Sequence, residues 1–238
     1  MKFSISIQYI TPYHFELHWP NSIDPDILLD MARVRKIIEM KLANEMVNII
    51  SSYCILGLYF KSPPNKAFIQ MELTEIIKDQ KPGNDQERFK WTIPVCYDFE
   101  FAPDLEAYLK KKQMDIDTFI HIHSRKDYLL YFYGFLPGFM YLGGMDQRLS
   151  IPRKASPDRK IETGAVAIGG NQTGVYPGES PGGWHVIGKT PIEIFHPNKG
   201  YAPFQIADYI HFGSINKKQF LNIRGKKDYK LHKERMDG

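Results

Sequence analysis

The sequence has few cysteines, no long apolar run and little excess charge, and each shortage excludes a class of protein. Cys54 and Cys96 are the only cysteines among 238 residues. We therefore expect neither a disulfide framework nor a cysteine metal cluster. We expect reduced thiols, in a protein of a reducing compartment. The longest apolar stretches, 53–60 and 129–135, fall far short of the roughly 18 residues that span a bilayer. We expect a soluble, cytoplasmic protein that does not enter a membrane.

The charge balance argues against nucleic acid as a partner. Basic residues number 31 and acidic residues 27, giving a net charge of +4. Much of the excess lies in the C-terminal tail, at Lys226, Lys227, Lys230, Lys233 and Arg235. A basic tail can contact nucleic acid, but solvated terminal lysines are commoner. We interpret the tail as a solubilising end.

The first third of the chain predicts a small α+β domain. Residues 1–7 and 14–19 alternate polar and apolar positions, which indicates strands and excludes the unbroken apolar core of an export signal. Asp24 followed by Pro25 predicts the start of a helix whose apolar stripe continues to Leu42. Two further strands at 46–50 and 54–60 and a helix at 68–77 complete the domain, which we assign to residues 1–85.

After the polar stretch 81–86 the sequence changes character, and residues 86–238 form a second predicted domain. A strand at 88–97 and short helices at 104–113 and 115–123 are followed by segments typical of strands. Twelve of the eighteen glycines fall between Gly134 and Gly188. Such density indicates unusual backbone angles and many loops, so we expect the functional site there.

Two motif matches in this region do not predict their usual chemistry. Gly178–Gly182 fits the G-x-S-x-G pattern of a nucleophile elbow, but Pro181 follows the serine and has no N–H for an oxyanion hole. Gly183–Thr190 fits a phosphate-binding P-loop, but 184–187 and 191–195 both alternate like strands. A hairpin is expected instead, with Ser180 as a turn residue and Lys189 either solvated or in contact with an anion.

Eight histidines raise the possibility of a metal site, which their placement does not support. His121 and His123 are two residues apart in a predicted helix, where they point to different faces. No metal site is predicted. His123 could act as an acid or base because its ordinary pKa lies near neutrality, and a hydrogen-bonded structural histidine is the alternative. The same two possibilities apply to His185.

The segment 135–144 alternates aromatic residues with residues that expose backbone amides. It could line an apolar pocket or form an irregular corner of the core. Arg148 and Arg153 follow, and their forked donors suit a carboxylate or phosphate, with surface ion pairing as the alternative.

The combined motifs resemble the signature of one family, that of the B subunit of 5-oxoprolinase. This family is also called allophanate hydrolase subunit 1 and includes an inhibitor of sporulation kinase A. The motifs are 134–144 (GFLPGFMYLGG), Pro152-Arg153, 170–177 (GNQTGVYP) and 180–184 (SPGGW).

The resemblance implies a fold, an activity and partners. The implied α+β fold is a small N-terminal α/β domain followed by a cyclophilin-like β-barrel domain. The implied activity is ATP-dependent opening of 5-oxoproline to glutamate, with a tight complex with the C subunit of 5-oxoprolinase, joint action with its A subunit, and Mg accompanying the ATP. Two alternatives stay open: a binding protein that inhibits a histidine kinase, and a component of a related hydrolase of amide or urea type. Prolyl isomerisation would rest on the fold alone.

Candidate site residues follow from the motifs and from the chemistry of a lactam. Amide resonance makes the lactam carbonyl a poor electrophile, so ring opening needs donors for developing anionic charge. Arg153, Gln172 and Thr173 are predicted to bind substrate or phosphate, and His123 is a candidate acid or base. The other predicted pocket residues are Phe135, Pro137, Gly138, Phe139, Tyr176, Ser180 and Trp184.

Overall fold

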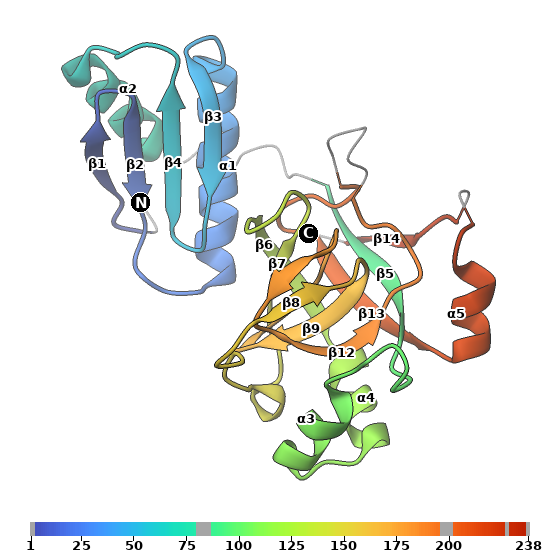
Figure 1. Cartoon of the computed structure of the whole chain (residues 1–238). Helices are drawn as coiled ribbons and strands as arrows, with labels where there is room; N and C mark the ends of the chain where they lie inside the picture. The colour runs from blue at the N-terminus through green and yellow to red at the C-terminus, as the bar shows by residue number, and fades with distance from the viewer. Residues whose placement is uncertain (1–2, 80–86, 196–201, 227–228, 237–238) are drawn as a thin grey trace. The chain divides into compact units, whose positions relative to one another are not determined.

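The computed structural model describes residues 3–79, 87–195, 202–226 and 229–236. The chain divides into two compact units, residues 1–86 and 87–238 (Figure 1). The polar stretch 81–86, where the sequence predicted a break, lies outside the described residues. Each unit is described by itself.

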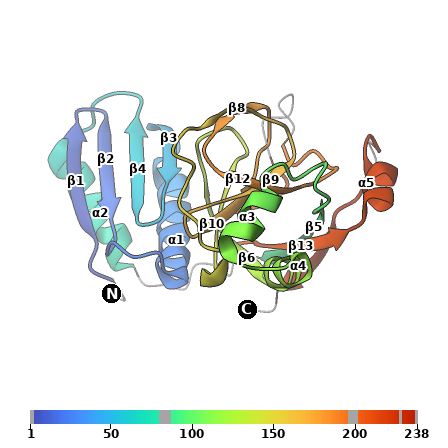
Figure 2. The same cartoon turned by 60° about the horizontal axis from the view of Figure 1, so that its bottom comes forward.

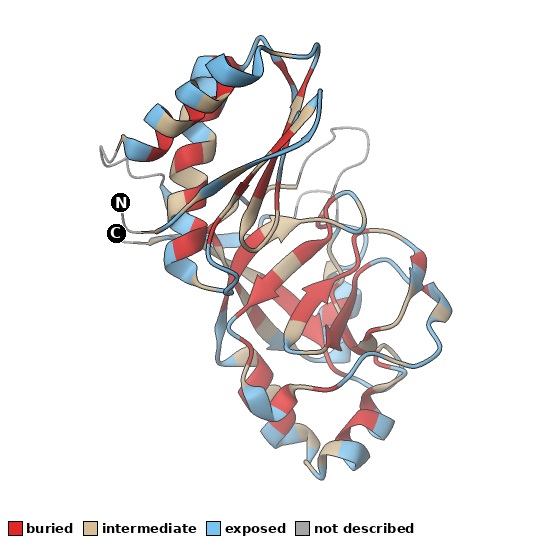
Figure 3. Cartoon of the chain, turned by 90° about the vertical axis from the view of Figure 1, so that its left-hand side faces the viewer, coloured by how far each residue is buried: buried red, intermediate tan, exposed pale blue. Residues whose placement is uncertain are grey.

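The N-terminal unit is a four-stranded antiparallel sheet in the order β1-β2-β4-β3, with both helices on one face (Figures 1 and 3). Its elements are β1 (Ser6–Thr11), β2 (His14–His18), α1 (Pro25–Leu42), β3 (Met46–Ser51), β4 (Ile55–Phe60) and α2 (Lys66–Lys78). The predicted N-cap is confirmed, because the Asp24 side chain accepts a hydrogen bond from the N–H of Asp26. The predicted first strand is wrong in position: it begins at Ser6, opposite the end of β2 at His18.

Apolar side chains of the helices and sheet form the core of this unit. From α1 come Ile27, Leu28, Met31, Val34, Ile38 and Leu42, and from the sheet Phe15, Leu17, Leu56, Leu58 and Phe60. β2 and β4 point alternate residues at the helices, which confirms the period of two expected for β2. No helix in the described part of the chain is long and apolar enough to cross a membrane.

The second unit is a barrel. Its elements are β5 (Arg88–Cys96), α3 (Leu105–Lys112), α4 (Ile116–Ser124), β6 (Asp127–Tyr133), β7 (Met140–Gly143), a 3₁₀ turn (Gln147–Leu149), β8 (Asp158–Ile161), β9 (Ala165–Gly169), β10 (Gln172–Val175), β11 (Ser180–Gly182), β12 (His185–Lys189), β13 (Tyr209–Ile215), α5 (Lys217–Ile223) and β14 (His232–Met236). The strand order is β12-β9-β10-β7-β6-β13-β5, and a β12–β5 pairing closes the ring. β14 adds to β5 outside the ring, and β8 with β11 forms a separate ribbon. The predicted α+β class, with a barrel after a small α/β unit, is confirmed.

The interior of the barrel is an apolar core shared by the strands and two short helices. Helices α3 and α4 lie together at one end of the barrel (Figure 2). They contribute Leu105, Tyr108, Phe119 and Ile122 to the same cluster as Val166 of β9. The helix starts predicted at Asp104 and Asp115 are confirmed, and Asp115 caps α4 through the N–H of Thr118.

Asp208, just before β13, is a buried carboxylate that holds the start of β5. The residue is 1% exposed. It accepts hydrogen bonds from the Phe89 N–H (2.8 Å), the Trp91 indole N–H (2.9 Å) and the Gln205 N–H (2.8 Å). A buried carboxylate is tolerated when donors replace its hydration. These bonds fix β5 against β13, with which it pairs in parallel.

The strand predicted at 191–195 is wrong. β12 ends at Lys189, which pairs with Cys96 of β5, and residues 191–195 form bends. Continuing this antiparallel register by two residues would place Pro191 opposite Pro94. Since proline has no N–H, the ladder is weakened at that step. The predicted hairpin is therefore absent as well.

We expect Asp208→Asn to lower the free energy of unfolding by about 2–3 kcal/mol, because an amide nitrogen would face a buried donor. Urea denaturation at pH 7 measures the change. Asp127→Asn is the matched control, since Asp127 is exposed and pairs only with His211 among the described residues. Equal effects of the two substitutions would contradict the role of Asp208.

Candidate functional site on the outer wall of the barrel

The strand β9 separates two apolar clusters. Val166 and Ile168 point into the barrel, whereas Ala165 and Ala167 belong to a second cluster on the outer wall. Gly169 continues the outward series. The outward residues are small, so large rings can lie close against this wall of the barrel.

Aromatic rings of the signature motifs form this second cluster. Phe139, Tyr176 and Trp184 are only 2%, 1% and 4% exposed. The Phe139 ring meets the Tyr176 ring edge to face at 5.2 Å and the Trp184 ring at 5.3 Å. Ile161 and Val186 complete the cluster, and Tyr141 packs at its margin. The rings fill the space between them, so this part of the signature is a closed outer core rather than an open pocket.

Two glycines give the rings their room. A methyl group on Gly169 would lie 2.5 Å from the Trp184 ring, and one on Gly182 would lie 2.3 Å from the Tyr176 hydroxyl. The Tyr176 hydroxyl accepts the backbone N–H of Trp184. Burial raises the pKa of Tyr176 to about 12, against the opposing pull of that bond and of the Arg153 charge. The hydroxyl therefore keeps its proton at neutral pH.

The loop between β6 and β7 presents an exposed ring above this cluster. Phe135 has φ 63° and is 59% exposed. A bulky residue with positive φ is strained, and such strain concentrates at functional sites. Its ring touches Phe139 and Tyr176 edge to face, at 5.6 and 6.4 Å. Pro137 beside it is exposed, and Gly138 is buried with φ 85°.

Arg153 lies over the same outer face. Its guanidinium is 5.7 Å from the centre of the Trp184 ring and makes no ion pair with a described residue. The next residue, Lys154, anchors the segment through its ammonium, 2.7 Å from Asp104 and also in contact with Asp158. Burial lowers the pKa of Lys154, but the hydrogen bonds to the two carboxylates outweigh that effect and raise it. Arg153 is thus held in place with its hydrogen-bond donors available.

Gln172 and Ser180 point to this outer face with buried polar atoms. Gln172 pairs with Gly169 and Ser180 with Ile161, and residues paired across antiparallel strands point to the same side. The Gln172 amide nitrogen and the Ser180 hydroxyl are buried and have no hydrogen-bond partner in the part of the chain that the structure describes. A buried polar group without a partner is costly, so a hydrogen bond to either atom would be stabilising.

His123 and Thr173 lie inside the barrel, away from the outer face. Both are 0% exposed. The Thr173 hydroxyl donates to the Ala167 carbonyl (3.1 Å) and therefore accepts from Nε2–H of His123 (3.0 Å). Nδ1 of His123 then accepts from the Tyr97 hydroxyl (2.8 Å). Burial lowers the pKa of His123 to about 3, so the ring is neutral. This placement fits the structural alternative for His123, and the catalytic role stays a prediction.

The other sequence candidates have partners of their own. Lys189 forms an ion pair with Glu162, and Arg148 forms one with Asp146 at 2.7 Å, as the surface alternative for Arg148 expected. His185 is half-buried beside the Pro152 carbonyl (3.0 Å). Among the described residues, no three His, Cys, Asp or Glu side chains are grouped as a metal site requires.

Comparison with known proteins places this architecture in a family. Residues 5–204 match the family described as carboxyltransferase domain, subdomain C and D. The chain belongs to this family. The match includes β1 to β12 and all the signature motifs, so the outer-wall cluster lies within the shared part.

Individual relatives confirm the resemblance found in the sequence. The B subunit of the 5-oxoprolinase of Bacillus subtilis is 42% identical over 156 residues, which cover 65% of this chain and 63% of that protein. The match thus spans less than two thirds of that relative. A conserved uncharacterized protein from Pyrococcus horikoshii is 32% identical, covers 90% of this chain and 100% of its own, and has a TM-score of 0.53.

A third match concerns the fold alone. The urea amidolyase of Kluyveromyces lactis has a TM-score of 0.75 at 15% identity, and the match covers 98% of this chain and 16% of that protein. The folds of both units of this chain therefore have counterparts in that larger structure.

Sequence reasoning missed the residues that support the site. Gly169 provides the surface for Trp184, Tyr141 lies at the margin of the cluster, and Lys154 anchors the segment of Arg153. One signal was available: 165–169 (AVAIG) alternates small with β-branched residues, which indicates a strand covered on both sides. Nothing in the sequence pairs Lys154 with Asp104.

We expect Gly169→Ala to lower the free energy of unfolding by about 1–3 kcal/mol, because the new methyl group would overlap the Trp184 ring. Gly178→Ala in the same region is the matched control, since a methyl group there meets nothing within 4 Å. Urea denaturation measures both. If Gly169→Ala is no more destabilising than Gly178→Ala, the packing of Trp184 on Gly169 is wrong.

We expect His123 to make stability depend on pH. The unfolded chain binds a proton at this histidine near pH 6.5, whereas the folded protein binds it only near pH 3. Stability therefore falls as pH decreases from about 6.5 towards 3, by on the order of 1.4 kcal/mol per pH unit. His123→Gln should reduce that slope, and His121→Gln, exposed on the same helix, should retain it. An unchanged slope in His123→Gln would contradict the assignment.

Proposed function

We propose that this chain is the B subunit of an ATP-dependent 5-oxoprolinase that opens 5-oxoproline to glutamate together with the A and C subunits. The observation that carries the proposal is the 42% identity to a protein named as the B subunit of 5-oxoprolinase. Supporting it is the outer-wall site, where the residues of the signature motifs gather around one aromatic cluster.

The polar groups of the outer face suit a small cyclic amide that carries a carboxylate. The free guanidinium donors of Arg153 match a carboxylate, or the phosphate that activates the lactam. The unpaired groups of Gln172 and Ser180 are buried, so they meet the amide N–H and C=O of the ring only when the outer face opens. Arg153 and Gln172 keep their proposed substrate roles, whereas Thr173 loses its own because its hydroxyl is bonded inside the barrel.

The described part of this chain alone offers no P-loop for the phosphates of ATP. The P-loop match at Gly183–Thr190 contains the strand β12, whose backbone pairs with β9, and Lys189 forms an ion pair with Glu162. Among the described residues, no three His, Cys, Asp or Glu side chains are grouped, as a metal site built from protein side chains alone would require. We therefore assign ATP and Mg to the assembled complex and to no residue of this chain.

The experiment that tests the proposal measures ATP-dependent formation of glutamate from 5-oxoproline. This chain is co-purified with its candidate A and C partners, and each of the three chains is omitted in turn. Loss of activity when this chain is omitted supports the proposal. A stable complex without turnover would point to a different amide substrate, and a chain that assembles with neither partner would favour regulatory binding to a histidine kinase. Either result would overturn the proposal.

We expect Arg153→Ala to lower kcat/KM for 5-oxoproline roughly 10- to 100-fold, the range for loss of a charged hydrogen bond. Arg153→Lys should recover only part of this, because an ammonium cannot make the forked contact. Arg159→Ala is the matched control, since Arg159 is an exposed arginine of the neighbouring β8. Unchanged assembly and turnover in Arg153→Ala would exclude the anion-binding role.

A further inference from the structure

One edge of β5 is shared by two strands. β12 pairs with it only at Cys96, through Lys189, whereas the C-terminal strand β14 pairs with it from Arg88 to Thr92. Figure 1 shows β14 beside β5. β13 occupies the other edge of β5 from Lys90 to Cys96. The edge towards β12 is therefore divided between a strand of the barrel wall and a strand that arrives from the end of the chain.

Residues 191–195 have the sequence of a strand that would continue β12. They alternate as Pro-Ile-Glu-Ile-Phe, and Ile194 is 2% exposed. If the register of Lys189 with Cys96 continued, Glu193 would lie opposite Thr92 and Phe195 opposite Lys90. These two positions of β5 now face His232 and Glu234 of β14. The two segments therefore compete for the same hydrogen-bonding edge.

The contacts that hold β14 are exposed. Glu234 pairs with Lys90 at 2.9 Å, and Arg235 pairs with Glu87 at 3.1 Å. The Lys233 ammonium lies 4.3 Å from the centre of the Phe89 ring and 5.2 Å from that of Trp91. Four of the five residues of the strand are exposed. Exposed ion pairs stabilise little and weaken with salt, so β14 belongs to the easily opened part of the fold.

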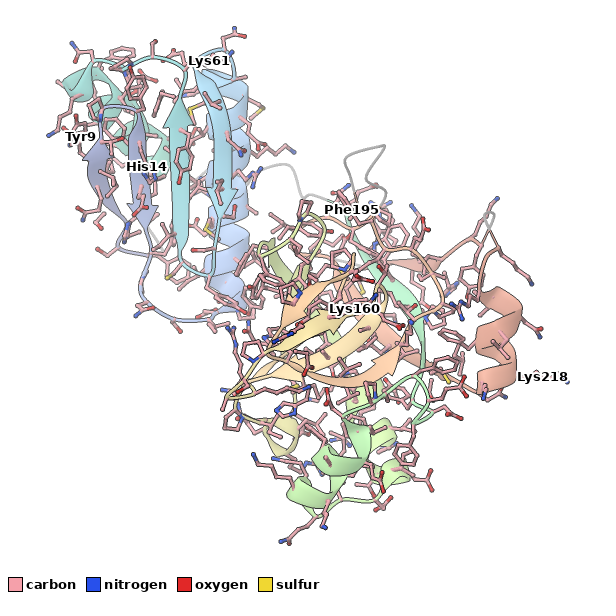
Figure 4. The ribbon with its side chains drawn as sticks, viewed as in Figure 1. Tyr9, His14, Lys61, Lys160, Phe195 and Lys218 are labelled. Atoms are coloured by element: carbon pink, nitrogen blue, oxygen red, sulfur yellow. The ribbon has the colours of Figure 1, made fainter. Side chains whose placement is uncertain are left out.

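While β14 occupies the edge, residues 191–195 contact the signature loop instead. Phe195, labelled in Figure 4, lies so close to Gly138 that a methyl group there would be 2.6 Å from its side chain. Gly138 has φ 85° and lies between Pro137 and the buried Phe139. The position of Phe195 is thus coupled to the loop that carries Phe135 over the candidate site.

We propose that β14 is a displaceable strand that sets the position of the signature loop. On β5, it keeps residues 191–195 off the edge and Phe195 against Gly138. When β14 leaves, residues 192–195 pair with β5 beyond the Pro191–Pro94 step, where the prolines donate no hydrogen bond, and Phe195 withdraws from Gly138. Ile194 then lies opposite Trp91, where Lys233 now lies, so the indole stays covered. The proposal concerns backbone pairing and holds whichever ligand the site binds.

The first test is hydrogen exchange, measured by mass spectrometry on the whole chain and on a chain that ends at Leu231. Leu231 is kept because it packs on the barrel core. Removal of β14 should slow exchange in 191–195 by about tenfold as these amides enter a ladder, and β5 should stay protected. Faster or unchanged exchange in 191–195, with loss of protection at 88–92, would overturn the proposal. A chain that ends at Met236 is the control and should match the full protein.

A milder variant decides the question if the shortened chain does not fold. Lys233→Glu with Glu234→Lys keeps the net charge but removes the ammonium from the rings and places a lysine opposite Lys90. It should slow exchange in 191–195 and move the Gly138 amide resonance as the Phe195 ring leaves. The control is Lys230→Glu with Glu106→Lys, at two exposed positions outside β14. If the β14 variant changes neither 191–195 nor Gly138, the proposal is wrong.

Discussion

Closure of the barrel depends on β5, and β5 depends on one buried carboxylate. Asp208 gathers the Phe89 backbone, the Trp91 indole and the Gln205 backbone around two oxygens. That arrangement sets the start of β5 beside β13, and Cys96 near the other end of β5 pairs with Lys189 and completes the ring. The desolvation of the carboxylate is offset because three donors replace its water. A polar cluster thus fixes the register on which the apolar core relies.

The outer-wall cluster uses the same strands twice. β9 gives Val166 and Ile168 to the interior and Ala167 to the rings outside, and β10 gives Thr173 to the interior and Gly174 to the outside. A site on this wall is rigid, since the strands that carry it cannot move without disturbing the interior of the barrel. Only the loop of Phe135 and the segment of Arg153 lie outside that constraint.

Local sequence signals predicted most elements correctly because their causes are local. Asp24 caps its helix as expected, the helix expected at 115–123 is present, and alternation located β2. The strand predicted at 191–195 was wrong because the residues that oppose it are distant in the sequence. Pro94 lies in another strand, and β14 comes from the far end of the chain. The strand propensity of a segment does not reveal which other segments compete with it for the same strand edge.

The candidate site was predictable in composition but not in geometry. The motifs named aromatic residues that do pack together in the outer-wall cluster, and the binding role of Arg153 stays a prediction. The motifs also assigned Gln172 and the adjacent Thr173 to one pocket. In a strand, neighbours point to opposite sides. The side that faces the interior was fixed by pairing, since Thr173 lies opposite Ile168. The sequence could not decide between a catalytic and a structural role for His123. Its neighbours Tyr97, Thr173 and Phe212 are distant in the sequence, so its environment is visible only in the fold.

The two cysteines differ in their expected reactivity towards thiol reagents. Cys54 is partly exposed in the N-terminal unit, and Cys96 is buried in β5. Burial raises the pKa of the Cys96 thiol, which further slows its alkylation because the thiolate is the reactive form. A maleimide dye would therefore attach to the N-terminal unit of the unaltered protein. The rate at which Cys96 reacts would then report how often the barrel opens along β5.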